Sequence, residues 1–261
     1  MKTPLLSIVA SGLFARSNSR SGKFLKNGCN RGVTWLLVCL LGVVLSGSGG
    51  KAWAAISSAA ADAAFTPVAA WPTVAEWVFD HSSEAAGAVE VTPVREGEPL
   101  VLLPGMSLVA DNRAPGGKAL KMDGTQSKWA TSANVLPTKE NVYVDLRFCA
   151  SQDGAERQTL VKLSRGPEIR VNLKTSTVEL ILWTVDKKWI SARVPYVPGE
   201  WSALRASVID GVLTLELNGE IATARMPEGG VLETGPSRVY VGCYGDRPFK
   251  GAVAYLALRS P

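Results

Sequence analysis

The strongest constraint on the fold of this chain is a hydrophobic period of two that recurs from Trp71 onward. Residues 142–148 (VYVDLRF) show it most clearly, because every second residue is a large apolar one. Apolar residues at alternate positions line one face of a β-strand, whereas a helix needs spacings of three and four. No stretch after position 70 keeps the helical spacing for three turns. The pattern therefore predicts an all-β domain over residues 71–261.

Eleven segments of this domain carry the strand pattern, separated by turn residues at hairpin spacings. Asp210-Gly211 predicts a hairpin, and Asn218-Gly219 ends the next strand, because these residue types tolerate the positive φ of tight turns. Many short strands with such connections predict a sandwich of two antiparallel sheets. The predicted strands are 76–79, 119–122, 142–148, 159–163, 168–174, 177–184, 189–194, 202–208, 212–217, 238–243 and 252–258.

Residues 1–54 have the composition of an export signal. They contain seven Lys and Arg, no acidic residue, an uncharged run at 33–45 and the small-x-small sequence Ala52-Trp53-Ala54. These features predict a signal peptide that is cleaved before Ala55. An uncleaved membrane anchor is the alternative, although 13 helical residues rise only about 20 Å against a hydrocarbon core of about 30 Å. Residues 55–70, rich in Ala and Ser, are expected to form a flexible spacer.

The basic charge of the chain belongs to this predicted leader. The whole sequence has 28 Lys and Arg against 23 Asp and Glu, and removing the seven basic residues of the leader leaves 21 against 23. The formal charge of the remainder is −2, which does not favour a nucleic-acid partner. We expect a secreted, periplasmic or cell-surface protein that has a membrane partner only if the leader stays attached.

Two cysteines, Cys149 and Cys243, lie on predicted strands of the domain. An exported protein meets an oxidising compartment, and two cysteines allow one intrachain bridge. We predict a disulfide between them, with two small core residues as the alternative, since the strand register decides whether their Cα atoms come within bonding range.

Five short motifs follow one another through the domain. They are 77–80 (WVFD), 117–124 (GKALKMDG), 199–219 with its G-E-W start and N-G end, 239–242 (VYVG) and 249–258 (FKGAVAYLAL). In this order they resemble the motifs of laminin G-like and pentraxin-like domains of the concanavalin A-like superfamily. The resemblance implies a jelly-roll sandwich over 71–261. It leaves the function open, because this superfamily includes lectins, protein-binding modules, hydrolases and lyases.

Few residues of the domain offer catalytic chemistry. The one histidine, His81, follows a predicted strand with no motif nearby, and we expect a solvated turn residue. Glu168 and Glu179, on consecutive predicted strands, are the carboxylate pair best placed to face one another, as glycoside hydrolysis requires. A structural alternative explains them equally well, because Arg170 lies beside them and would form a cross-strand ion pair.

No metal or other cofactor is predicted. Zinc sites need clustered Cys and His, and the sequence has no such cluster. The resemblance to laminin G-like domains leaves calcium as an alternative, because these domains often hold it through acidic loop residues. Asp80, Asp123, Asp210 and Asp246 lie at the ends of predicted strands, without the D-x-D-x-D spacing of a calcium loop.

The predicted functional site is the polar face of three successive strands, 168–174, 177–184 and 189–194. Aromatic rings stack on the C–H faces of sugars, and polar groups hold the hydroxyls. We therefore predict a binding module without catalytic activity that recognises a glycan or another extracellular or cell-surface component; a hydrolase or lyase acting on glycans and a structural surface protein are the alternatives. The two tryptophans could instead be a cross-strand pair that stabilises a hairpin. The predicted ligand-binding residues are Arg170, Asn172, Glu179, Trp183, Trp189 and Arg193.

Overall fold

The computed structural model describes residues 69–80, 83–85, 88–95, 97–103, 106–114, 116–125, 129–136, 140–233 and 235–261. The predicted signal peptide, all but the last two residues of the predicted spacer, and His81 lie outside the described residues. Within the described ranges all regular structure is β-strand, and no helix there is long and apolar enough to cross a membrane.

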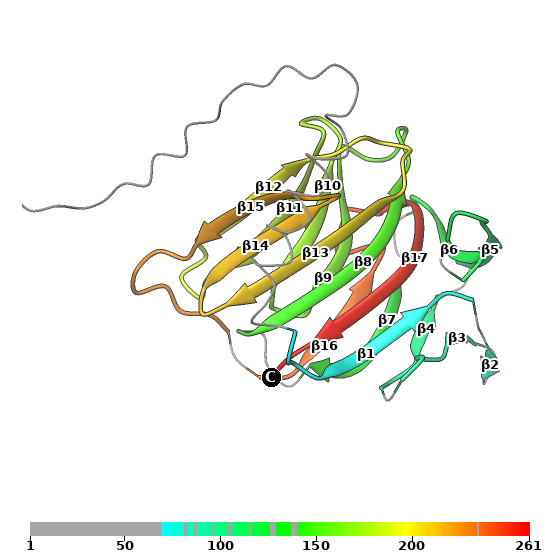
Figure 1. Cartoon of the computed structure of the whole chain (residues 1–261), viewed down its shortest axis with the longest axis horizontal. Helices are drawn as coiled ribbons and strands as arrows, with labels where there is room; N and C mark the ends of the chain where they lie inside the picture. Colours follow the sequence, from blue (N-terminus) through cyan, green and yellow to red (C-terminus); the bar gives the residue numbers. More distant parts are fainter. Residues whose placement is uncertain are drawn as a thin grey trace, which may run out of the picture. The chain divides into compact units, whose positions relative to one another are not determined.

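The strands form two antiparallel sheets that stack as a sandwich, so the predicted fold class is confirmed (Figure 1). The eight-stranded sheet has the order β15-β14-β13-β8-β17-β6-β5, and β1 also pairs with β17. Its strands are β1 (Thr73–Val78), β5 (Ser107–Ala110), β6 (Lys118–Asp123), β8 (Val142–Ala150), β13 (Ser202–Ile209), β14 (Val212–Leu217), β15 (Glu220–Arg225) and β17 (Lys250–Arg259).

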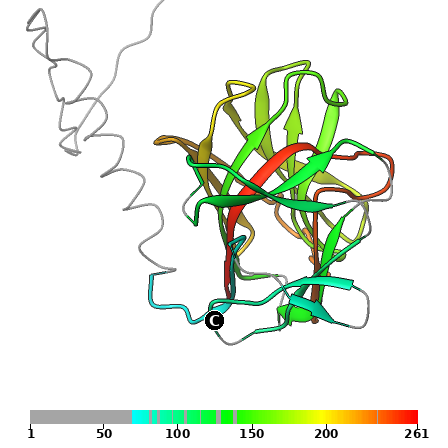
Figure 2. The ribbon, with the colours of Figure 1, turned by 90° about the vertical axis from the view of Figure 1, so that its right-hand side faces the viewer.

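The second layer is a nine-stranded sheet with the order β12-β11-β10-β9-β16-β7-β4-β3-β2. Its strands are β2 (Ser83–Ala85), β3 (Ala88–Val91), β4 (Leu100–Leu102), β7 (Ala130–Leu136), β9 (Arg157–Leu163), β10 (Glu168–Asn172), β11 (Thr177–Trp183), β12 (Trp189–Pro195) and β16 (Ser237–Val241). The two layers can be followed in the turned view of Figure 2.

The core lies between the sheets, where the alternating apolar residues meet. Phe148 on β8 and Trp77 on β1 are fully buried from one sheet, and Ile169 and Val171 on β10 belong to the same core from the other. Burial of this kind contributes about 1.5–3 kcal/mol for each large side chain. The period of two therefore decides which face of each strand points inward.

β17 holds a central place in the eight-stranded sheet, where it is drawn in red in Figure 1. One of its edges pairs with β8, and the other pairs with β6 and then with β1. Leu256, for example, is opposite both Leu146 and Trp77. This strand therefore joins segments that lie far apart in the sequence.

All eleven predicted strands are present, and the described residues contain six more: β2, β3, β4, β5, β7 and β15. β15 shows why these were missed. Its sequence EIATAR carries small and polar residues at an exposed sheet edge, so its hydrophobic alternation is weak. Asn218 and Gly219 both have positive φ and form the turn of a β14–β15 hairpin. The turn predicted to end one strand also starts another.

The predicted disulfide is wrong, because Cys149 and Cys243 are not bonded to one another. Cys149 lies on β8 next to the core-facing Phe148, so its side chain points to the outer face of the eight-stranded sheet. Cys243 follows β16 in the other sheet. Stacked sheets are about 10 Å apart, whereas the Cα atoms of a disulfide lie within about 7 Å. Residues on different sheets, one of them pointing outward, cannot be bridged.

Candidate ligand-binding site

A pocket of about 460 Å³ opens on the outer face of the nine-stranded sheet, over β10, β11 and β12. The core-facing residues of these strands, such as Val171 and Val178, point the other way. All six residues predicted from the sequence line this pocket. The lining residues are Arg157, Arg170, Asn172, Thr175, Glu179, Ile181, Trp183, Trp189, Arg193 and Arg247.

The register of the strands brings the predicted residues into neighbouring rows. Arg170 on β10 is opposite Glu179 on β11, which is opposite Arg193 on β12. Trp183 is opposite Trp189 at the hairpin end of β11 and β12. Because the three strands follow one another through short turns, their order in the sheet equals their order in the sequence. This is why alternation alone could place these side chains on one face.

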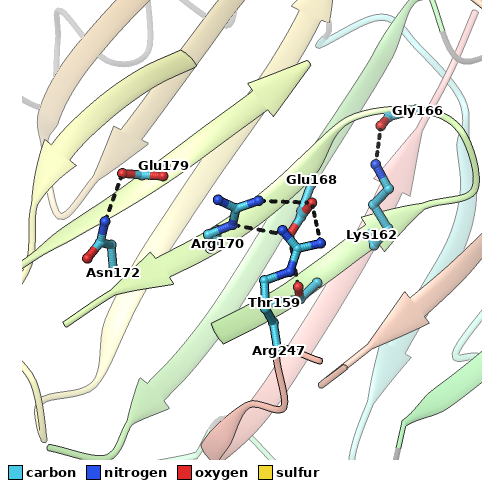
Figure 3. A network of polar contacts seen from close by, with 8 residues as sticks. All are labelled: Thr159, Lys162, Gly166, Glu168, Arg170, Asn172, Glu179 and Arg247. Carbon is cyan, nitrogen blue, oxygen red and sulfur yellow. Dashed lines mark hydrogen bonds and ion pairs between the residues drawn. The ribbon is translucent and has the colours of Figure 1, made fainter. Parts of the chain in front are cut away.

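Glu168 lies at the centre of a buried polar network beneath the pocket (Figure 3). Its carboxylate accepts a hydrogen bond of 2.8 Å from Thr159 Oγ1 and forms ion pairs with Arg170 Nε at 3.3 Å and Arg247 Nη2 at 3.4 Å. Its side chain is only 1% exposed. A buried carboxylate is costly unless it is paired and hydrogen-bonded, so both guanidiniums stabilise it. We call these four residues the Glu168 network.

Arg247 reaches this network from the loop between β16 and β17. The backbone N–H of Thr159 donates to the carbonyl of Arg247 at 3.0 Å, and Lys250 N donates to Gln158 Oε1 at 2.8 Å. These bonds tie the part of the loop that precedes β17 to β9. Arg247 is therefore held over the sheet face by backbone geometry as well as by its ion pair with Glu168.

Glu179 forms a second polar cluster at the side of the pocket. Its Oε1 accepts a hydrogen bond from Asn172 Nδ2 at 3.3 Å and lies 3.4 Å from Arg193 Nε. The Arg193 Nε–H also donates to Ser191 Oγ at 3.1 Å. The Arg193 guanidinium is 5.7 Å from the ring centroid of Trp189, within the range of a cation–π interaction. The cluster thus connects a buried carboxylate to the aromatic rim.

Trp183 and Trp189 form that rim. Their ring centroids are 6.2 Å apart with an interplanar angle of 36°, which is the geometry of a tilted cross-strand aromatic pair. The pair stabilises the β11–β12 hairpin, which is the alternative role that the sequence left open for the two tryptophans. The rings still leave 43% of Trp183 and 48% of Trp189 exposed. Both side chains therefore retain free aromatic surface beside the pocket.

Glu168 and Glu179 do not face one another as the catalytic alternative required. Glu168 is opposite Ile181, while the residue opposite Glu179 is Arg170, which Figure 3 shows between the two carboxylates. The ion pair of Arg170 runs along β10 to Glu168 and not across the strands. Both carboxylates are buried and paired with guanidiniums. Among the described residues no group of three His, Cys, Asp or Glu side chains could hold a metal ion.

Three cations near this face were missed from the sequence: Arg157, Lys162 and Arg247. Arg157 and Lys162 lie on β9, where a shift of register opposite Ile169 and Arg170 breaks the period of two. Lys162 is buried; its Nζ donates to the carbonyl of Gly166 at 2.7 Å, and burial lowers the pKa of its ammonium to about 8. A strand bulge and a loop carry little hydrophobic pattern, so the positions of these cations depend on the tertiary structure.

No protein-family model matches this chain, and no curated protein matches it. Its fold is similar to solved binding domains. The botulinum neurotoxin serotype D binding domain aligns with a TM-score of 0.53 and 12% identity over 72% of this chain and 48% of that one. The chain thus spans about half the length of the neurotoxin domains that it matches.

Two further neighbours were solved in complex with a ligand. Domain 4 of AbnA, a GH43 extracellular arabinanase from Geobacillus stearothermophilus, in complex with arabinotriose, aligns with a TM-score of 0.51 and 17% identity over 73% of this chain and 93% of that one. The binding domain of botulinum neurotoxin DC in complex with SialylT gives 0.50 and 9% over 68% and 46%. At such identities the likeness shows the fold alone, which is a β-sandwich.

Proposed function

We propose that this chain is a binding module without catalytic activity that recognises a glycan through the pocket over β10, β11 and β12. The observation that carries the proposal is the exposed Trp183–Trp189 pair beside a polar floor whose groups are already held in place. The pocket volume of about 460 Å³ lies within the usual range of ligand sites, about 300–1,000 Å³.

The chemistry of the lining fits a sugar. The two indole rings offer apolar faces for the C–H surface of a sugar ring. Arg193, Glu179 and Asn172 offer charged or amide groups that bind hydroxyls, and charge-assisted hydrogen bonds are about twice as strong as neutral ones. Because these polar groups already contact one another, little side-chain entropy is lost when a ligand binds.

The remaining parts of the proposal concern the family and the location. We propose that the β-sandwich is of the concanavalin A-like, laminin G-like type, that residues 1–54 direct export as a signal peptide, and that 55–70 link it to the domain at 71–261. Neighbours that were solved in complex with arabinotriose and with SialylT support a glycan partner. The motif order and the composition of the leader support the family and an extracellular place of action.

An oligosaccharide array probed with the full chain tests the proposed function. Trp183→Ala is expected to lower the affinity for the best-bound glycan at least tenfold, about 1.4 kcal/mol, while the hairpin loses only about 0.2–1 kcal/mol of stability. Val197→Ala, an exposed apolar residue outside the pocket, is the control and is expected to bind like the wild type. Absence of binding to every glycan, or release of reducing sugar that Glu179→Gln abolishes, would contradict the proposal.

A further inference from the structure

Four arginines converge on the pocket over β10, β11 and β12: Arg157, Arg170, Arg193 and Arg247. They come from β9, β10, β12 and the β16–β17 loop, so their meeting is a property of the fold and not of one basic segment. The rest of the chain after the leader carries a small formal excess of acidic residues. The four arginines therefore meet in this pocket although the chain after the leader is not basic as a whole.

The carboxylates near these arginines do not balance them. Within the described residues, Glu168 pairs with Arg170 and Arg247, and Glu179 pairs with Arg193. Two carboxylates thus meet four guanidiniums, and the ammonium of Lys162, opposite Glu168 across the strands, adds to the excess. Like charges brought together in a partly buried site repel one another more strongly than in water. An anion in the pocket would relieve this repulsion.

The arginines differ in how far they are already engaged. The Arg170 side chain is only 9% exposed and is held by Glu168, whereas 48% of Arg193 and 25% of Arg247 remain exposed. Nε of Arg247 is buried and has no hydrogen-bond partner in the described part of the chain. Arg157 is exposed and lies opposite Asn172, at the end of the pocket farther from the tryptophans. Arg157, Arg193 and Arg247 therefore have guanidinium surface available for a ligand.

The rows of the sheet set the distance between the two ends of the pocket, one formed by the tryptophans and the other by Arg157. Asn172 and Arg157 share a row with Thr177 of β11, and Trp183 lies six residues farther along the same strand. At about 3.3 Å per residue the two ends are about 20 Å apart. A ligand that contacts both ends must be an extended oligomer of several sugar units.

We infer that the glycan recognised by this pocket is an anionic oligosaccharide, in which one sugar stacks on Trp183 and Trp189 while a carboxylate or sulfate on a sugar farther along the oligosaccharide is held by Arg157. This inference rests on the proposed function and names the class of its ligand. Guanidinium groups form paired, parallel hydrogen bonds with planar or tetrahedral oxyanions, which gives them preference over neutral hydroxyls.

Matched pairs of oligosaccharides that differ only in charge test the inference. A galacturonate tetramer and its methyl ester present a carboxylate and its neutral form, and a sulfated galactan tetrasaccharide and its desulfated form do the same for sulfate, because the galactan backbone carries no carboxylate. Calorimetric titration of the full chain is expected to give about tenfold tighter binding of the charged member of at least one pair. The pair that shows the difference identifies the anionic group.

Two variants separate a built site from general attraction. Arg157→Gln is expected to lower the affinity for the charged member about fivefold or more and to leave the neutral member unchanged. Arg225→Gln, which removes an exposed arginine at the edge of the other sheet, is the control and is expected to change neither. The same loss from both variants would overturn the inference, because any basic residue would then serve.

Two other outcomes are distinguishable. If charged and neutral members bind equally, and Trp183→Ala abolishes both, the inference is wrong and the proposed glycan-binding function stands. If no oligosaccharide of either pair and none on the array binds, the proposed function and the inference fail together.

Discussion

Replacing Glu168 by Gln is expected to destabilise the domain strongly. The change keeps the size of the side chain and an oxygen that accepts the hydrogen bond from Thr159, but it leaves Arg170 and Arg247 without their shared carboxylate. Removing one partner of a buried ion pair costs about 3–5 kcal/mol, because the remaining charge is buried and uncompensated. Arg170, with a side chain 9% exposed, accounts for most of this cost, since Arg247 can move toward water.

The magnitude can be measured by urea unfolding of Glu168→Gln, Arg170→Gln and the double variant. The double variant removes the buried pair together and is expected to recover at least about 2 kcal/mol relative to the sum of the two single changes. If Glu168→Gln is too unstable to fold, the double variant is still expected to fold. Glu156→Gln, a carboxylate 54% exposed whose partner Lys174 lies 4.0 Å away at the surface, is the control and should change stability little. A cost below about 1 kcal/mol for Glu168→Gln, or additive single changes, would refute the reasoning.

Two further predictions concern the buried Lys162 and the separated cysteines, Cys149 and Cys243. Burial lowers the pKa of Lys162 in the folded domain to about 8 from 10.5, against the opposing effect of Glu168. Between these two pH values the unfolded chain binds more protons than the folded domain does. The free energy of unfolding that depends on this group therefore rises with pH. Urea unfolding should therefore show Lys162→Met more stable than the wild type by up to about 3 kcal/mol at pH 7, with the gap closing toward pH 10.5, and a constant gap would contradict this. Alkylation in denaturant without reductant, followed by mass spectrometry, should label both Cys149 and Cys243. Detection of a disulfide-linked peptide that contains both cysteines would contradict this prediction.

The polar face of β10, β11 and β12 could be predicted because local rules decide it. The three strands are consecutive, their turns are short, and period-two burial assigns each side chain to a face. The cross-strand pairing of Trp183 with Trp189 could be predicted because the two residues flank the turn of one hairpin at matching positions. For such segments, neighbours in sequence are also neighbours in the sheet.

The rest depended on contacts that no local pattern records. Arg247 comes from a loop that crosses the sheet, and Arg157 lies on a strand whose bulge breaks the alternation. The separation of Cys149 from Cys243 depended on which sheet each strand joins, and this is a property of the global topology. The register that places Arg170, and not Glu168, opposite Glu179 also depended on how the two strands pair, which alternation does not fix.

The central place of β17 governs how this domain acquires its structure. Its partners β1, β6 and β8 are distant in sequence. Large loops must therefore close, at a cost in chain entropy, before the contacts between these strands form and stabilise the sheet. Folding should be slow and should involve both layers in one event, with no autonomous half. The segment that carries Arg247 joins β16 of one layer to β17 of the other, so the pocket over β10, β11 and β12 would be completed in that same event.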